Sequence, residues 1–350
     1  MVSRIEDVAQ AAGVSTATVS RALRGLPKVS DSTRAKVLKA AADLQYVASP
    51  TASSLASGKT HVVGVVVPYV TRWYFAHLIS GASEVLREQG FHVLLFDVGD
   101  EGPHRALLLD SRMLFKRVDA VLILSLRLHQ AERELLRRLN VPVVTVGVPD
   151  DDWPCVRIDD YETTRLATEH LIALGHRHIG YVGGDTVPSM DFPTPADRAR
   201  GFRETMQKHG LTVAAGSVVM GDWTAVSGRQ VGRELLSRPD RPTAVVAASD
   251  ELALGVLAAA RELGLAVPAD VSVIGIDDHE MADLNGLTTV AQPVVEQGRM
   301  ATQLLLSAVA GHDLGHEVAT VPTRLVVRSS TGAPPVSADA ARHPAPVSAR

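Results

Sequence analysis

Residues 4–34, RIEDVAQAAGVSTATVSRALRGLPKVSDSTR, decide how the N-terminal part of this chain folds. Four apolar residues recur at the spacing of one face of an α-helix: Ile5, Val8, Ala9 and Ala12. Gly13 suits a tight turn after that helix, and Ser15 can cap the next one. In the second helix, Val19 and Leu23 are expected to be buried. The stretch therefore predicts a helix-turn-helix.

The outer face of the second helix determines what such a unit could bind. It would carry short side chains and one arginine: Thr16, Ala17, Ser20 and Arg21. Short side chains can approach base edges in the major groove without a clash, and arginine can bond guanine or a phosphate. The pattern alone is equally compatible with an ordinary helical hairpin that has a solvated face.

The residues of this stretch also resemble those of a known family. DVAQAAGVSTATVSRAL (7–23), with Val29–Ser30, Thr33–Arg34 and Tyr46, closely resembles the DNA-binding headpiece of the lactose-repressor (LacI/GalR-type) family. The resemblance assigns the choice of operator to three positions: Thr16, Ala17 and Arg21. It places seven further residues at or near the DNA backbone: Ser15, Thr18, Ser20, Lys28, Ser30, Thr33 and Arg34.

The charge of the chain is divided unevenly between its parts. Residues 1–59 hold eight lysines or arginines and four acids, a formal charge of +4, whereas the whole chain carries −4. A small basic unit on an acidic body keeps the attraction for phosphate local. The overall negative charge is therefore compatible with DNA binding.

Several features of the composition favour a cytoplasmic, nucleoid-associated protein with no membrane partner. Cys155 is the single cysteine, which excludes an internal disulfide and suits a reducing compartment. The first ten residues, MVSRIEDVAQ, lack a hydrophobic secretion core. No apolar run approaches the ~20 residues needed to span a bilayer.

A third helix is expected from about Ser30 to Tyr46, and residues 48–60 follow as a short segment of low intrinsic stability. A helix of barely two turns is marginal in water, so the residues alone favour a flexible Ser/Ala linker. The resemblance implies a hinge that becomes helical on the operator, pairs with its copy and inserts Leu55 into the minor groove. The segment departs from the common family pattern at three positions: Ala48, Ser49 and Ser53. The last of these removes an arginine and with it one expected DNA contact.

From His61 onward the pattern changes to alternating strands and helices. The run HVVGVVVPYV (61–70) is continuous and β-branched, as in a strand buried on both faces. Further strands are predicted at 91–98, 120–125, 141–147, 178–184, 243–249 and 271–277. Helices are predicted between them, at 77–90, 165–175, 198–210 and 253–264. This alternation predicts an α/β fold with parallel doubly wound sheets, and its length predicts two Rossmann-like lobes.

The resemblance implies an all-α helix-turn-helix headpiece followed by a two-lobed core of the periplasmic-binding-protein type (type I). The headpiece would span 1–47, the hinge 48–60, and the effector-binding and dimerisation core 61–332. The first lobe would comprise about 61–162 and 292–322, and the second about 163–291 and 323–332. The three crossovers would lie near 160–164, 289–292 and 320–324. Residues 333–350, rich in Pro, Ala and Ser, predict a disordered tail.

Ligands of open α/β sheets bind beyond the carboxyl ends of the strands, where several polar residues of this chain fall. Asp277 and Asp278 end one predicted strand, and Ser249 and Asp250 end another. These residues could alternatively only cap the helices that follow. The resemblance implies four residues that hold the effector: Arg198, Trp223, Asp277 and Gln292. Ser249 stands where the lactose repressor has an asparagine, so an amide contact is lost or replaced by a hydroxyl.

The first lobe offers a second wall for the cleft. Tyr74 and Phe75 follow Arg72 and Trp73, which depart from the Asn-Pro-Phe-Phe that the family often shows there. Either aromatic could line the cleft, although plain packing is an alternative, as it is for Trp223. A carboxylate, a guanidinium and an indole suit a hydroxyl-rich ring. The expected effector is therefore a sugar or sugar derivative, with a nucleobase as the alternative and no cofactor.

Enzymatic and metal-binding interpretations have little support in the sequence. His176 and His178 lie two residues apart with no nearby third ligand, which is a weak metal motif. Cys155 has no family signature of a catalytic nucleophile around it. The chain lacks the hydrolase, P-loop and dinucleotide motifs that would accompany such activities. A secreted sugar-binding protein without a regulatory role would have no use for residues 1–59.

The sequence therefore predicts a transcriptional regulator that is not an enzyme. One headpiece reads only a few base pairs, so two copies related by a two-fold axis are expected to read a palindromic operator. The expected protein is a homodimeric, ligand-responsive repressor of genes for carbohydrate uptake or breakdown.

Overall fold

The computed structural model describes residues 3–46, 58–99, 114–184 and 192–335. The chain divides into two compact units, 1–61 and 62–350, and each is described by itself. The predicted hinge residue Leu55, most of the segment around it and residues 336–350 lie outside the described residues.

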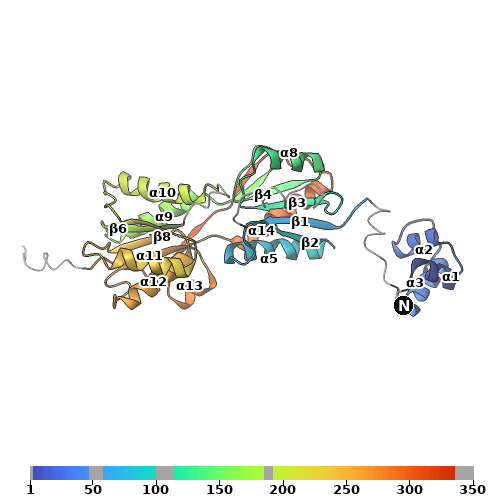
Figure 1. The fold of residues 1–350 in the computed structure, drawn as a ribbon, viewed down its shortest axis with the longest axis horizontal. Helices are drawn as coiled ribbons and strands as arrows, with labels where there is room; N and C mark the ends of the chain where they lie inside the picture. The colour runs from blue at the N-terminus through green and yellow to red at the C-terminus, as the bar shows by residue number, and fades with distance from the viewer. Residues whose placement is uncertain (1–2, 47–57, 100–113, 185–191, 336–350) are drawn as a thin grey trace, which may run out of the picture. The chain divides into compact units, whose positions relative to one another are not determined.

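Within residues 3–46, the first unit is a bundle of three helices (Figure 1): α1 (Ile5–Ala12), α2 (Thr16–Leu23) and α3 (Asp31–Asp43). The backbone of Gly13 is left-handed, with φ of 67°, which turns the chain from α1 into α2. The caps predicted at Ser15 and Ser30 are confirmed, because their hydroxyls accept from the N–H groups of Thr18 and Thr33. The core contains Val8, Ala9, Val19, Ala22, Val37, Ala40 and Ala41. The prediction that Leu23 is buried was wrong: it is half-buried, and Ala22 takes the interior position.

The first lobe of the second unit is a six-stranded parallel sheet in the order β11-β5-β4-β3-β1-β2. Its strands are β1 (Val62–Val67), β2 (His92–Asp97), β3 (Ala120–Leu124), β4 (Val143–Val146), β5 (Cys155–Arg157) and β11 (Val318–Thr320). Helices α5 (Trp73–Glu88) and α14 (Val294–Val309) cover one face of this sheet, and helix α8 (Gln130–Leu139) covers the other (Figure 1). Alternate residues of β1 enter the two apolar layers, which explains its uninterrupted β-branched sequence.

The second lobe repeats this arrangement with the strand order β12-β10-β9-β8-β6-β7. Its strands are β6 (Ile179–Gly184), β7 (Val218–Gly221), β8 (Ala244–Ala247), β9 (Ser272–Asp277), β10 (Thr288–Ala291) and β12 (Arg324–Val326). Its helices are α9 (Asp160–Ala173), α10 (Thr194–Lys208), α11 (Ala225–Leu236), α12 (Asp250–Glu262) and α13 (Glu280–Leu284). Strand β12 is antiparallel to β10, so this sheet is not purely parallel.

Three crossovers join the two lobes. The chain leaves the first sheet after Arg157 and enters α9, which packs in the second lobe, so residues 160–162 belong there rather than to the first lobe. It returns between Ala291 and Val294 and crosses again between Thr320 and Arg324.

Helices α5 and α14 lie side by side in the first lobe (Figure 1), and two glycines permit their close approach. A Cβ atom at Gly298 would overlap the carbonyl oxygen of Leu78, and one at Gly81 would overlap that of Val295. Any larger side chain at these positions would push the helices apart, so the position of α14 on α5 is fixed.

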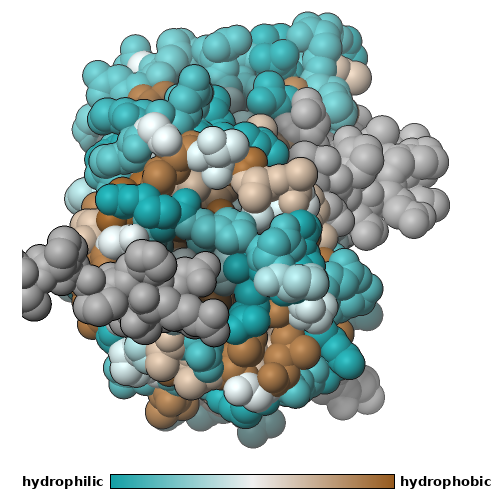
Figure 2. Space-filling view, turned by 90° about the vertical axis from the view of Figure 1, so that its left-hand side faces the viewer, coloured by the Kyte–Doolittle hydropathy of each residue, from teal (hydrophilic) through white to brown (hydrophobic). Residues whose placement is uncertain are grey.

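The C-terminal part of the described chain packs against the second lobe. The end of this lobe has a mainly hydrophilic surface with smaller apolar areas (Figure 2). Pro334 lies over Gly175, although the sequence assigns it to a disordered tail. The ordered chain therefore extends past the predicted boundary at residue 332.

Candidate functional site

The α2 helix presents the residues that the sequence assigned to DNA reading. Thr16, Ala17 and Arg21 are exposed, and Ser20 is half-buried. The hydroxyls of Ser15 and Thr18 lie 2.9 Å apart at the start of the helix. They order the first turn, so the outer face of α2 is held rigidly for contact with a groove.

The residues predicted to face the DNA backbone divide into two groups. Ser30 caps α3, with its hydroxyl 2.8 Å from that of Thr33, and Lys28 is exposed. The guanidinium of Arg34 instead donates to the carbonyl oxygens of Ala22 and Leu26, at 3.1 and 3.0 Å. Arg34 therefore braces the turn between α2 and α3, a role that its sequence neighbours did not indicate.

In the second unit, the predicted effector residues gather at the carboxyl ends of the second-lobe strands. Asp277 ends β9, Ser249 follows β8, Trp223 follows β7 and Gln292 follows β10. The Ser249 hydroxyl accepts from the N–H of Leu252, so the capping interpretation holds for this residue. Asp278 pairs with Arg328 at 2.8 Å and is thereby fixed beside the strand end.

Arg198 is the buried cation of this cluster, and its main partner was missed in the sequence. Its Nε donates to Asp160 Oδ1 at 2.7 Å, and its Nη1 donates to the carbonyl oxygen of Ala248. Asp160 Oδ2 also accepts from the hydroxyl of Thr194 at 3.0 Å. Both charged side chains are buried, at 6% and 12% exposed, so the pair is shielded from solvent.

Trp223 forms an aromatic wall beside this pair. Its ring covers Gly184 so closely that a Cβ atom there would overlap it, and its backbone is left-handed, with φ of 68°. The guanidinium of Arg198 lies 5.9 Å from the ring centre, and the Phe192 ring lies 6.1 Å away. An indole held in this way can cover the apolar face of a ring-shaped ligand.

Two carboxylic acids are buried in the same region. Burial is the main cause that raises the pKa of Asp277, and the charge of Arg198 opposes the rise. Burial also raises the pKa of Asp250, followed by the charge of Asp277. Asp250 is tied to the lobe by the hydroxyl of Thr289 at 2.7 Å and the N–H of His279 at 2.9 Å.

Asp277 adopts an unusual backbone conformation, with φ of 130°, and Asp278 follows with φ of 62°. Non-glycine residues in this region cost of order 1–3 kcal/mol each and cluster at functional sites. The strained pair supports a ligand-binding role for Asp277.

The first lobe contributes Tyr74, at the start of α5. Burial raises the pKa of its phenol, which interacts with the side chain of Ser125 and is influenced by the charges of Asp160, Arg198 and Asp277. Its hydroxyl therefore stays neutral and can act as a hydrogen-bonding group. Phe75 belongs to the core of the first lobe and contacts Tyr74 edge-on at 5.2 Å, so its ring supports that of Tyr74.

Arg72 and Trp73, which depart from the sequence that the family often shows at this turn, connect the two lobes. Arg72 Nη1 donates to the carbonyl oxygen of Asp222 at 2.8 Å. The indole N–H of Trp73 donates to Glu280. The Trp73 ring also lies between the imidazoles of His77 and His279, at 4.4 and 4.8 Å. These contacts hold the lobes together on the side of the cleft where α5 begins.

Comparison with known proteins places this arrangement in a family. Residues 4–49 match the family described as bacterial regulatory proteins, lacI family, and residues 168–331 match a periplasmic binding protein-like domain. The chain is 33% identical over 331 residues to catabolite control protein A of Priestia megaterium, covering 93% of this chain and 98% of that protein. The chain belongs to the lacI family.

Two solved structures resemble nearly the whole of this lacI-family chain. One is the lac repressor dimer bound to operator and the anti-inducer ONPF, with 29% identity and a TM-score of 0.85, covering 95% of this chain and 100% of that one. The other is a complex of the transcriptional regulator CelR with cellobiose, with 33% identity and a TM-score of 0.69, covering 94% and 99%. These two structures are of a transcriptional regulator and of a repressor bound to operator.

The residues considered for metal or nucleophilic chemistry have structural roles in this lacI-family chain. His176 is fully buried between the hydroxyls of Thr243 and Ser272, and Nε2 also lies 2.9 Å from the carbonyl oxygen of Gly332. Burial raises the pKa of the Cys155 thiol. Within the described ranges, no cluster of three or more potential metal ligands occurs, and no helix is long and apolar enough to cross a membrane.

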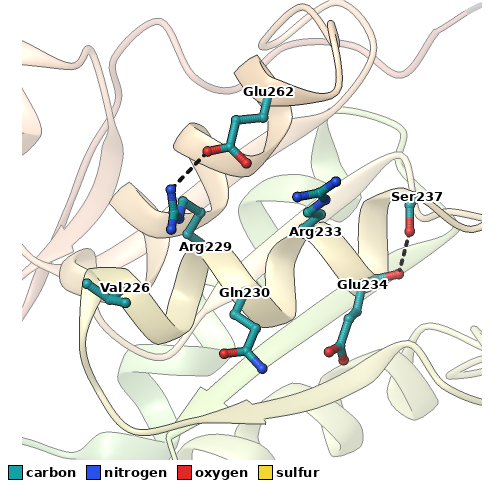
Figure 3. A pocket seen from close by; sticks show the side chains of 7 residues that line it. All are labelled: Val226, Arg229, Gln230, Arg233, Glu234, Ser237 and Glu262. Carbon is teal, nitrogen blue, oxygen red and sulfur yellow. Dashed lines mark hydrogen bonds and ion pairs between the residues drawn. The ribbon is translucent and has the colours of Figure 1, made fainter.

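An open groove along α11 and α12 lies away from these residues (Figure 3). Arg229 pairs there with Glu262 at 3.1 Å, and the hydroxyl of Ser237 donates to the carbonyl oxygen of Glu234. None of the residues predicted for the effector lines it, so this groove is not the predicted site.

The burial of His176 predicts that the free energy of unfolding depends on pH. Burial lowers its pKa, so the native state binds a proton less readily than the unfolded chain. The stabilisation is therefore present above about pH 6.5 and is lost as the pH falls below it. Half-buried His170, whose pKa is also lowered by burial, contributes in the same direction.

Buried Asp250 and Asp277, whose pKa values are raised, act in the opposite direction. The expected result is therefore a difference between variants: from about pH 7.5 to 5.5, the slope of the free energy of unfolding against pH should be less positive in His176→Gln than in the wild type. Urea unfolding followed by circular dichroism measures it. His92→Gln, at an exposed position, is the matched control for the loss of a histidine. An identical slope in His176→Gln would contradict the assignment.

Proposed function

We propose that this lacI-family chain is a ligand-responsive repressor that binds a palindromic operator as a homodimer in the cytoplasm, at the nucleoid. Its effector is a sugar or sugar derivative, and it catalyses no reaction. The observation that carries the proposal is the combination, in one chain, of two features. One is a capped α2 helix with an exposed Thr16–Ala17–Arg21 face, and the other is a pair of buried charged residues, Arg198 and Asp277, with half-buried Trp223 beside Arg198.

The DNA-binding half of the proposal depends on α2. Thr16 and Ala17 are short enough for the helix to lie deep in a major groove, and Arg21 can donate two hydrogen bonds to one guanine. Lys28 and the surrounding cations supply the salt-dependent attraction to phosphate. Two copies related by a two-fold axis would read two half-sites about one DNA turn apart. The solved lac repressor structure is a dimer bound to operator, which supports this arrangement.

The effector half depends on the chemistry of the cleft. Asp277 can accept from paired hydroxyls, Arg198 holds a fixed donor geometry, and Trp223 covers the C–H face of a ring. The solved CelR complex contains cellobiose, which is consistent with a sugar in this fold. These side chains need no metal or cofactor to hold such a ligand.

The two halves are coupled through the lobes. A ligand between the lobes acts only through its different affinity for two lobe arrangements. One arrangement would hold the two hinge segments of the dimer close enough to pair, and the other would separate them. The residues of the hinge, including Leu55, set the strength of that pairing.

A gel-shift titration tests the proposal directly. Palindromes from the promoter of the protein's own gene are titrated at fixed salt, with and without cellobiose, ribose and other sugars, and in parallel with nucleobases. Selective binding of a palindrome that changes with a sugar is the expected result. A change with nucleobases alone would favour the alternative effector, and no preference over random duplex would overturn the DNA-binding assignment.

A further inference from the structure

The candidate effector carboxylate is held by a chain of two side-chain amides that crosses from one lobe to the other. Gln292 Nε2 donates to Asp277 Oδ1 at 2.6 Å, and Gln297 Nε2 donates to Gln292 Oε1 at 3.0 Å. All three side chains are buried, at 7% exposed or less. Asp277 ends a strand of the second lobe, whereas Gln297 lies in the first turns of α14 in the first lobe.

The direction of this chain of hydrogen bonds follows from the charge at its end. An ionised carboxylate only accepts, so Gln292 must present its NH₂ group to Asp277 and its oxygen to Gln297. Hydrogen bonds aligned in this way strengthen one another in a buried setting. The Oε1 of Gln297 is left buried without a hydrogen-bond partner. An apolar residue at position 297 would avoid this unsatisfied oxygen, but it would leave the buried Oε1 of Gln292 without its donor.

The anchoring of Gln297 makes the amide chain sensitive to the position of the lobes. The next residue, Gly298, packs against the backbone of Leu78 in α5, which fixes this turn of α14 to the first lobe. Gln292 itself lies in the crossover between β10 and α14. A rotation of the lobes about this crossover would change the separation of Gln297 from Asp277 and weaken the donation to the carboxylate.

We infer that Gln297 is a positioning residue that couples the ionised state of Asp277 to the arrangement of the lobes, acting through Gln292. The first lobe thereby controls how readily the second lobe presents a charged acceptor to a ligand. The role of Asp277 as effector ligand rests on the proposed function, whereas the coupling itself can be measured without ligand or DNA.

A double-mutant cycle tests the inference. Gln297→Leu is measured in the wild-type and Asp277→Asn backgrounds by thermal unfolding of the full chain, at about pH 7.5 and about pH 4.5. Burial raises the pKa of Asp277, so its carboxyl is ionised at the higher pH and largely protonated at the lower one. The expected Tm loss caused by Gln297→Leu is larger at pH 7.5, by about 2–4 °C. In the Asp277→Asn background, the loss should be the same at both pH values.

A matched control separates this effect from general loss of packing. Thr302 lies on the same helix, is equally buried and donates to the carbonyl oxygen of Gly298, outside the amide chain. Thr302→Val should lower Tm equally at both pH values. If Gln297→Leu does not fold, Gln297→Met keeps the unbranched shape and replaces it in the cycle.

A Tm loss for Gln297 that does not depend on pH or on Asp277 would overturn the coupling. That result would leave operator binding and its response to sugars intact. Conversely, a chain that ignores every palindrome would refute the proposed function while the cycle could still show the coupling. The two failures are therefore distinguishable.

Discussion

Arg198→Ala should yield a protein that still binds operator but no longer responds to effector, and whose core is less stable by about 3–5 kcal/mol. The reason is that Arg198 is the buried partner of Asp160, at 2.7 Å. Its removal leaves an uncompensated charge in the interior and takes away a donor from the cleft. Urea unfolding measures the stability, and a gel shift with the effector measures the response.

Two further variants make this test specific. Arg200→Ala removes an exposed arginine from the same helix, whose pairing with Asp197 is on the surface, and should leave the free energy of unfolding nearly unchanged. Arg198→Ala combined with Asp160→Asn removes the unpaired charge and should recover part of the lost stability. If Arg198→Ala and the Arg200→Ala control lost equal stability, the buried Arg198–Asp160 pair would not stabilise the core more than a surface pair does.

Arg21→Ala should lower operator affinity by roughly 5- to 150-fold, which corresponds to the ~1–3 kcal/mol of a bidentate contact to guanine. Arg21 is exposed in the last turn of α2, so the headpiece core should remain intact. Fluorescence anisotropy on operator and on random duplex, at one salt concentration, gives the ratio of the two affinities. This ratio is expected to fall.

Arg24→Ala is the control of equal charge for this experiment. Arg24 is exposed at the end of α2, and its Nε donates to the carbonyl oxygen of Ser20. Its loss should weaken binding to both duplexes similarly, as expected for a contact with phosphate. Equal loss of the operator-to-random ratio in both variants would show that Arg21 does not read bases.

The parts of the fold that the sequence predicted well have local causes. The strand Val62–Val67 is buried on both faces, so its sequence had to be apolar throughout. The caps at Ser15 and Ser30 were visible because capping depends on residues only three apart. The short edge strands β7, β11 and β12 were missed because their residues are half-exposed and form no long apolar run.

The parts of the cleft that the sequence did not reveal depend on contacts between distant residues. Asp160 precedes its partner Arg198 by 38 positions, and its role follows only from the packing of α9 on α10. Gln297 occupies an interior position of α14 where an apolar side chain would be expected. The role of its amide becomes clear only when its hydrogen bond to Gln292, and that of Gln292 to Asp277, are known. Arg34 likewise resembled a surface cation until its two carbonyl partners were known.

The indole of Trp73 lies between two imidazoles and donates a hydrogen bond to a carboxylate of the second lobe. Its fluorescence can therefore be used to follow the lobes. Its emission must differ between joined and parted lobes, because parting would exchange a stacked, hydrogen-bonded ring for a hydrated one. The chain has only three tryptophans, so replacing Trp153 and Trp223 by phenylalanine would isolate this signal. The fluorescence of Trp73 would thus report the separation of the two lobes without an added label.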